Sequence, residues 1–123
     1  MLFLLVVAGL LWAVGSEAVT RDNFLVRNTQ DFIEICSVPD NDPLRDAAIG
    51  FCHGYGVGAV HYYLAAYSGP EAKKFVCLPD PPPSRSEGVQ MFLAWARENP
   101  QYLNEPAVET IFRWLGKKWP CPK

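Results

Sequence analysis

The sequence predicts a small all-α domain of four helices, stabilised by disulfides and preceded by a cleaved signal peptide. Three observations lead to this fold class. Apolar residues recur at helical spacing in four segments after residue 28, without an alternating strand pattern. Four cysteines lie far apart along the chain, and the first 14 residues are uncharged and almost wholly apolar. A length of 123 residues allows one domain.

The apolar opening is Met1–Val14, and polar residues follow it from Ser16 onward. It is shorter than the roughly 20 residues that a membrane-spanning helix needs. Ser16 and Ala18 are small residues at the two positions that a signal peptidase reads, so we expect cleavage after Ala18. Residues 1–18 are therefore predicted to be a signal peptide and residues 19–123 the mature domain. The lack of a basic n-region leaves an uncleaved anchor as the alternative.

The charge of the chain is nearly balanced, with 11 basic and 13 acidic residues and a formal net charge of −2. The longest basic runs are the pairs Lys73-Lys74 and Lys117-Lys118. This pattern argues against a nucleic-acid-binding protein and against a polybasic membrane surface. We therefore predict a protein partner, no nucleic acid, and membrane contact only through the signal segment before cleavage.

The four cysteines, Cys36, Cys52, Cys77 and Cys121, all lie beyond the predicted cleavage site. An even number of cysteines in an exported chain predicts two disulfides. A zinc site is the alternative, but it needs close ligand pairs, and the gaps here are 16, 25 and 44 positions. We predict no metal.

Capping residues and prolines predict the ends of the four helices. Asn28 or Thr29 caps the first, Asp42 the second, and a capping box from Ser84 to Glu87 the third. The predicted helices run from about residue 28 to 37, 43 to 67, 84 to 99 and 106 to 119.

The second predicted helix carries a stripe of glycines, Gly50, Gly54 and Gly58, at every fourth position. Each glycine costs about 0.5–1 kcal/mol relative to alanine inside a helix. We therefore expect the stripe to let a second backbone approach closely. Cysteine, histidine and tyrosine residues interrupt the run and make a transmembrane packing motif a poor alternative.

A proline-rich connector joins the second and third predicted helices. Asp80–Ser84 includes three consecutive prolines, which predict a stiff and extended segment exposed to solvent. Such a segment can bind a partner with little loss of conformational freedom. The alternative is a plain linker.

His53 and His61 are the side chains that could act as a general base near neutral pH. Eight residues apart on a helix, they lie about 80° apart around the axis and roughly 12 Å apart along it. They do not converge on one point, and the sequence holds neither a nucleophile elbow nor a phosphate-binding loop. We predict that the protein is not an enzyme and has no cofactor.

An ordered set of motifs resembles the Rap/Tai family of type VI secretion amidase immunity proteins. It spans about residues 36 to 121. Its members are Phe51–Gly58, Phe75–Pro79, Glu98–Pro100, Pro106-Ala107 and Trp119–Cys121.

The resemblance implies a disulfide-bonded helical protein in the bacterial periplasm, or secreted, that can form a homodimer. It implies binding to a peptidoglycan-cleaving amidase and inhibition by blocking the active-site cleft, without catalysis. The inhibitory loop of the family matches the connector by position. The predicted partner-binding residues are Gly69, Pro70, Asp80, Pro81, Pro82, Pro83 and Ser84.

The domain is also similar to the HdeA-type acid chaperone fold. By that analogy the disulfides are Cys36–Cys77 and Cys52–Cys121. The alternative pairs adjacent cysteines, Cys36 with Cys52 and Cys77 with Cys121, because antiparallel helices bring such ends together. The same resemblance supplies the alternative function, an orphan periplasmic stress or chaperone-like protein with another partner.

Overall fold

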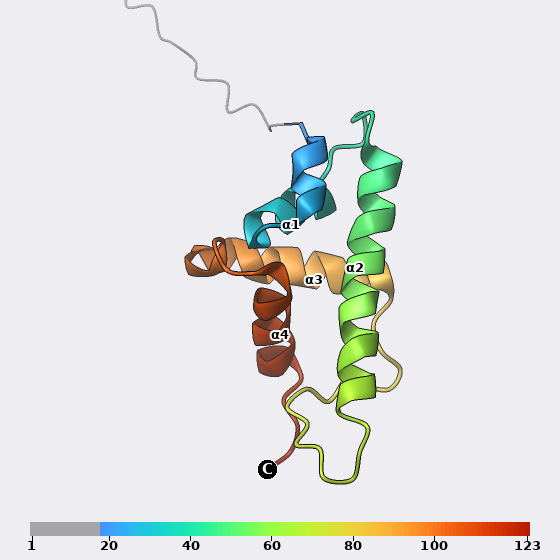
Figure 1. Cartoon of the computed structure of the whole chain (residues 1–123), viewed down its shortest axis with the longest axis vertical. Helices are drawn as coiled ribbons and strands as arrows, with labels where there is room; N and C mark the ends of the chain where they lie inside the picture. The colour runs from blue at the N-terminus through green and yellow to red at the C-terminus, as the bar shows by residue number, and fades with distance from the viewer. Residues whose placement is uncertain (1–17) are drawn as a thin grey trace, which may run out of the picture.

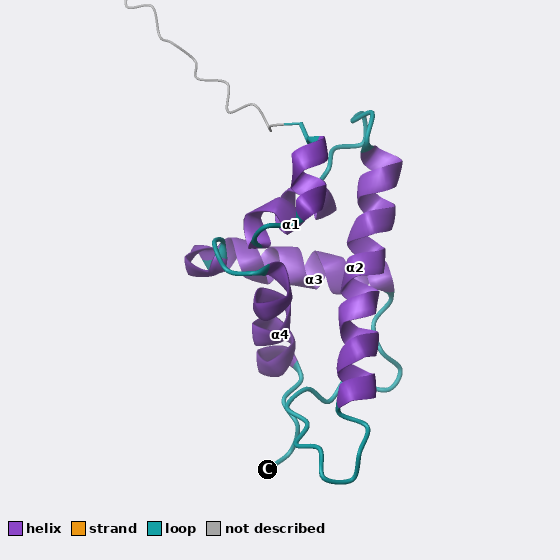
Figure 2. Ribbon diagram, in the orientation of Figure 1, coloured by secondary structure: helices purple, strands orange, loops and turns teal. Residues whose placement is uncertain are grey.

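The computed structural model describes residues 18–123, which form four α-helices and two short 3-10 helices (Figures 1 and 2). No strand is present in this range, and an isolated bridge pairs Val76 with Pro120. The predicted four-helix fold is therefore confirmed. The predicted signal peptide lies outside the described residues, apart from Ala18. In chain order the elements are η1 Arg21–Leu25, α1 Thr29–Cys36, α2 Arg45–Ala66, α3 Arg85–Glu98, η2 Pro100–Tyr102 and α4 Ala107–Lys118.

Two of the predicted caps are present. The side chain of Asn28 accepts a hydrogen bond of 3.0 Å from the N–H of Asp31 at the start of α1. At the start of α3, the Ser84 hydroxyl accepts from the N–H of Glu87 at 3.2 Å, and the Glu87 carboxylate accepts from the N–H of Ser84 at 3.0 Å. These bonds satisfy backbone donors that a helix leaves free in its first turn.

The predicted start of α2 at Pro43 is two residues early. The carboxylate of Asp42 accepts a hydrogen bond from the N–H of Leu44 at 2.8 Å and another from the N–H of Val19 at 3.2 Å. Asp42 therefore stabilises a turn that precedes the helix and ties it to the N-terminal segment. An aspartate in such a turn has the same sequence signature as a helix cap, which explains the early boundary.

The hydrophobic core is centred on α1, which contacts each of the other α-helices. Phe32 and Ile35 of α1 are buried. The ring of Phe32 lies 4.9 Å from that of Tyr55 on α2 and 5.8 Å from that of Phe92 on α3, measured between centroids. Figure 1 shows α3 crossing α2, with α1 above α3 and α4 below it. This short helix therefore holds the three longer ones together.

The first turn of α1 is fastened to the loop that precedes α4. The N–H of Thr29 donates to the carbonyl of Glu105 at 2.8 Å, and the N–H of Gln30 donates to that of Leu103 at 3.0 Å. The hydroxyls of Thr29 and Thr110 lie 2.6 Å apart, and both side chains are fully buried. Buried backbone donors need partners, and here the tertiary fold supplies them.

The structure contains two disulfides, as predicted, but the pairing implied by the HdeA analogy, Cys36–Cys77 with Cys52–Cys121, is wrong. Cys36 pairs with Cys52, and Cys77 pairs with Cys121. The turn between α1 and α2 returns the chain so that the first pair has its Cα atoms 5.3 Å apart. The connector returns to the chain end after α4, where the second pair has its Cα atoms 4.8 Å apart. Both separations suit a disulfide.

The glycine stripe of α2 does not pack within residues 18–123. Gly50, Gly54 and Gly58 are exposed, and a Cβ atom added at any of them would meet no other atom within 4 Å. The expected approach of a second backbone is therefore not made by the described chain. Instead α2 buries a different face, which includes Ala48 and Cys52. The homodimer that the resemblance implies stays a prediction.

A buried carboxylate joins η1 to α1. Asn23 donates to Asp31 from its side-chain amide at 3.1 Å, and Arg27 donates from its backbone N–H at 3.0 Å and from its guanidinium at 3.2 Å. Partial burial tends to raise the pKa of Asp31, but these hydrogen bonds and the charge of Arg27 outweigh it. The pKa of Asp31 is therefore lowered from its ordinary value of 3.8.

We expect Asp31→Asn to lower the free energy of unfolding by about 1–3 kcal/mol near pH 7, because an amide cannot accept from all these donors. A lowered pKa in the folded state stabilises the protein at pH values above the ordinary pKa. This stabilisation is lost as the pH falls below 3.8 and through the folded-state pKa. Urea unfolding at about pH 7 and about pH 2.5 should therefore show a smaller difference between variant and parent at the lower pH.

The matched control is Asp22→Asn, because Asp22 is exposed and accepts no hydrogen bond from residues 18–123. If Asp31→Asn lowers the free energy of unfolding by the same amount at both pH values, the role given to Asp31 is contradicted.

Candidate functional site

The connector, residues 68–84, contains no helix, and most of its side chains are exposed. In Figure 1 it leaves the lower end of α2, passes beside the C-terminal segment and then reaches α3. It contains every predicted partner-binding residue. The structure divides them between two loops, Gly69–Lys74 and Leu78–Ser84, on either side of a point where the chain is held. Gly69 and Pro70 are therefore not in the same loop as the prolines.

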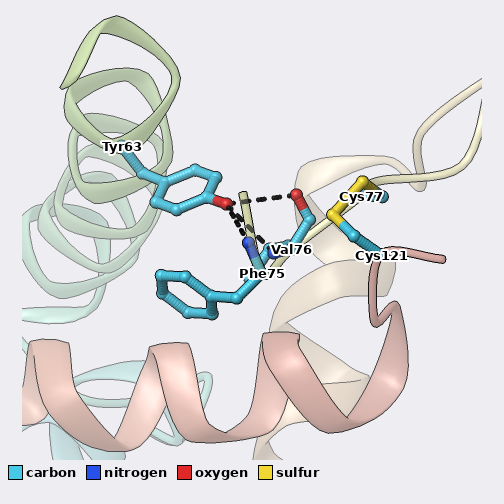
Figure 3. The surroundings of a disulfide bond; sticks show 5 residues. All are labelled: Tyr63, Phe75, Val76, Cys77 and Cys121. Carbon is cyan, nitrogen blue, oxygen red and sulfur yellow. Dashed lines mark hydrogen bonds between the residues drawn. A yellow bond between two sulfur atoms is a disulfide. The ribbon is translucent and has the colours of Figure 1, made fainter. Parts of the chain in front are cut away.

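The hydroxyl of Tyr63 on α2 holds this point (Figure 3). It accepts hydrogen bonds from the N–H groups of Phe75 and Val76, both at 3.0 Å, and donates to the carbonyl of Val76 at 3.3 Å. A tyrosine hydroxyl has one hydrogen and two lone pairs, so its hydrogen-bonding capacity is fully used. Two consecutive residues of the connector are thereby bound to the side of α2.

The next residue, Cys77, is bonded to the C-terminal segment that follows α4. Cys77 forms its disulfide with Cys121, and its N–H donates to the carbonyl of Trp119 at 2.8 Å. Figure 3 shows this disulfide beside the Tyr63 hydrogen bonds. A covalent link and four hydrogen bonds therefore fix the middle of the connector between α2 and the end of α4.

An aromatic cluster surrounds this anchor. The ring of Tyr63 lies 4.6 Å from that of Tyr67, 5.1 Å from that of Phe75 and 5.2 Å from that of Phe112, measured between centroids. Aromatic pairs at such distances add about 0.5–1.5 kcal/mol each beyond the area that they bury. The cluster closes one side of the space between α2 and α4.

Next to this cluster, an apolar pocket of about 300 Å³ opens between α2, α3, α4 and the second loop of the connector. Core side chains such as Cys52 and Phe92 form its base, and Trp114 and Trp119 line it from α4 and the segment that follows. The connector contributes Leu78, Pro82, Pro83 and Ser84 to its wall.

The two histidines line this pocket from α2. His53 is half-buried and His61 is exposed. The residues of α2 that line the pocket recur at helical spacing and form one face. These are Cys52, His53, Gly56, Val57, Val60, His61 and Leu64.

Sequence reasoning missed both the Tyr63 anchor and the pocket. Tyr63 is one of several tyrosines in a helix, and only its tertiary neighbours distinguish it from the exposed Tyr62. The spacing of His53, Val57, Val60 and Leu64 could have indicated an apolar face, but the glycine stripe was the more prominent pattern.

The described part of the chain gives no indication of a metal site or of a membrane span. Between residues 18 and 123, no three His, Cys, Asp or Glu side chains gather closely enough to hold a metal ion. No helix in that range has the length and apolar character needed to cross a bilayer.

The described residues form a small helical domain, cross-linked by two disulfides, with an exposed connector that is anchored at its middle. The chain belongs to the family of Rap1a immunity proteins, whose profile matches residues 28–121. The matched range contains all four α-helices, both disulfides and the connector. The match makes this an immunity-type protein, with a protein toxin as its partner. No curated protein and no solved structure matches the chain.

We expect Tyr63→Phe to lower the free energy of unfolding by about 1–3 kcal/mol, because it removes the hydroxyl and leaves two backbone donors without a partner. Hydrogen exchange should show a larger loss of protection at the amides of Phe75 and Val76 than at those of α1. The control is Tyr62→Phe, since the neighbouring Tyr62 is 77% exposed. Equal effects of the two substitutions would show that the hydroxyl of Tyr63 does not hold the connector.

Proposed function

We propose that this protein inhibits a secreted peptidoglycan amidase by inserting its connector into the active-site cleft of that enzyme. The observation that supports this proposal most is that the connector is exposed and yet anchored in the middle by Tyr63 and by the Cys77–Cys121 disulfide. A segment that is already ordered loses little conformational entropy on binding. Membership of an immunity family supports a toxin as the partner. That this toxin is an amidase is our proposal.

The loop Leu78–Ser84 is the better candidate for the inserted segment. Asp80, Pro81 and Pro82 are exposed, and the capping box at Ser84 fixes the far end of the loop. Proline has one backbone dihedral fixed by its ring, so consecutive prolines restrict the conformations of the loop. The first loop, with Gly69 and Pro70, is exposed too and would contact the enzyme beside the cleft.

We further propose that the protein acts in the bacterial periplasm after removal of residues 1–18, without catalytic activity of its own. Every cysteine of the chain is in a disulfide, which favours an oxidising compartment. In that compartment the protein would meet an enzyme that attacks the cell wall. The two histidines line a pocket with almost no other polar groups, which supports binding rather than bond cleavage.

We expect the double substitution Pro82→Gly and Pro83→Gly to weaken inhibition of the amidase roughly tenfold, because the loop must then be ordered on binding. The measurement is the inhibition constant against a secreted peptidoglycan amidase of the same bacterium, with purified peptidoglycan as substrate. Pro43→Gly is the matched control, because Pro43 is an exposed proline before α2, outside the connector, and should leave inhibition unchanged.

Two results would contradict the proposal in different ways. Unchanged inhibition by the double variant would exclude the proline loop as the inserted segment. Absence of binding between the parent protein and the secreted amidases of the same bacterium would exclude an amidase as partner. Suppression of client aggregation at low pH, together with that absence, would favour the chaperone-like alternative.

A further inference from the structure

The apolar pocket beside α2 reaches buried side chains of the core. Its lining comes from all four α-helices and the connector, and it includes the exposed Leu64 as well as the buried Cys52 and Phe92. Two glycines leave room inside it. Gly56 on α2 and Gly88 on α3 both line the pocket, and a Cβ atom added at either would meet nothing within 4 Å.

The size of the pocket suits a short hydrocarbon chain. Its volume of about 300 Å³ holds roughly ten methylene-sized groups, if each takes the 30 Å³ of a water molecule in the liquid. A leucine side chain has four carbon atoms and a phenylalanine side chain seven, so one side chain of a bound protein would leave much of this space empty. Concave apolar pockets with a few polar groups at one edge are typical of small-molecule sites.

The few polar groups of the pocket favour a negatively charged ligand. Arg85, His53, His61 and Ser84 are among the residues that line the pocket, whose inner surface is almost wholly apolar, and no Asp or Glu of the described residues is among them. Arg85 is exposed and makes no ion pair with any residue between 18 and 123. The nearby carboxylate of Glu87 accepts a hydrogen bond from the Ser84 N–H and does not line the pocket.

We propose that this pocket binds a single-chain carboxylate amphiphile of about ten carbon atoms, in effect a medium-chain fatty acid. Its hydrocarbon chain lies between α2 and α4 against Val60 and Trp114, and its carboxylate pairs with Arg85 at the mouth. A guanidinium can donate two parallel hydrogen bonds to a carboxylate, which an alcohol of the same length cannot accept in that way. This site does not depend on the proposed inhibition of an amidase.

The test is calorimetric titration of the purified disulfide-bonded protein with decanoate and, separately, with decanol. We expect saturable binding of one equivalent of decanoate, about tenfold tighter than decanol, with a change in the fluorescence of Trp114 and Trp119. Arg85→Gln should weaken decanoate binding to the level of decanol and leave decanol binding unchanged.

Filling the pocket provides the second arm. Gly56→Leu places a side chain inside it and should weaken both ligands by about tenfold or more, because the hydrocarbon chain loses its space. Gly54→Leu is the matched control, since Gly54 is an exposed, unobstructed glycine of the same helix and lies outside the pocket. Gly88→Leu fills the pocket from α3 and should repeat the effect if Gly56→Leu alters the fold.

Two results would overturn the proposal. The first is the absence of saturable decanoate binding, and the second is equal binding of decanoate by the Gly54→Leu and Gly56→Leu variants. If decanoate does not bind and Gly56→Leu abolishes toxin binding, the pocket holds a side chain of the partner instead. Failure of the amidase experiment alone would leave this site unaffected, because no enzyme enters the titration.

Discussion

The hydroxyl of Tyr63 is the interaction on which the shape of the exposed surface depends. A single oxygen holds the backbone of Phe75 and Val76 against α2, and the adjacent disulfide fixes Cys77 to the chain after α4. Because α4 is itself bonded to α1 through buried Thr110, the anchor is continuous with the core. The connector is therefore part of the folded unit, although it has no helix or strand of its own.

The anchor and the apolar pocket are neighbours in the fold. The aromatic cluster of Tyr63, Phe75 and Phe112 fills one side of the space between α2 and α4. On the other side, Gly56 and Gly88 contribute no side chain, and the connector passes across the opening with Pro82 and Pro83 in its wall. The surface proposed to meet a toxin and the pocket proposed to hold an amphiphile therefore share a wall.

Features that depend on neighbours in the chain could be predicted, and features that depend on distant contacts could not. The caps at Asn28 and at Ser84 were predicted because each bond joins residues three positions apart. The sequence around Asp42 is typical of a helix cap. Its hydrogen bond with Val19, 23 positions away, has no signature in the local sequence and could not be predicted. The glycines of α2 indicated close packing, yet the described chain places nothing against them, since a stripe of small residues does not specify what approaches it.

The sequence by itself determined the helical class, the number of α-helices, the presence of two disulfides and the exposed proline segment. Each of these depends on local periodicity, on composition or on the fixed geometry of proline. Only the tertiary structure decided which cysteines pair, which tyrosine holds the connector and where the two histidines meet a pocket. Those outcomes depend on how the other helices pack against α1. The contacts that fix this packing join residues far apart in the chain, such as Thr29 and Thr110.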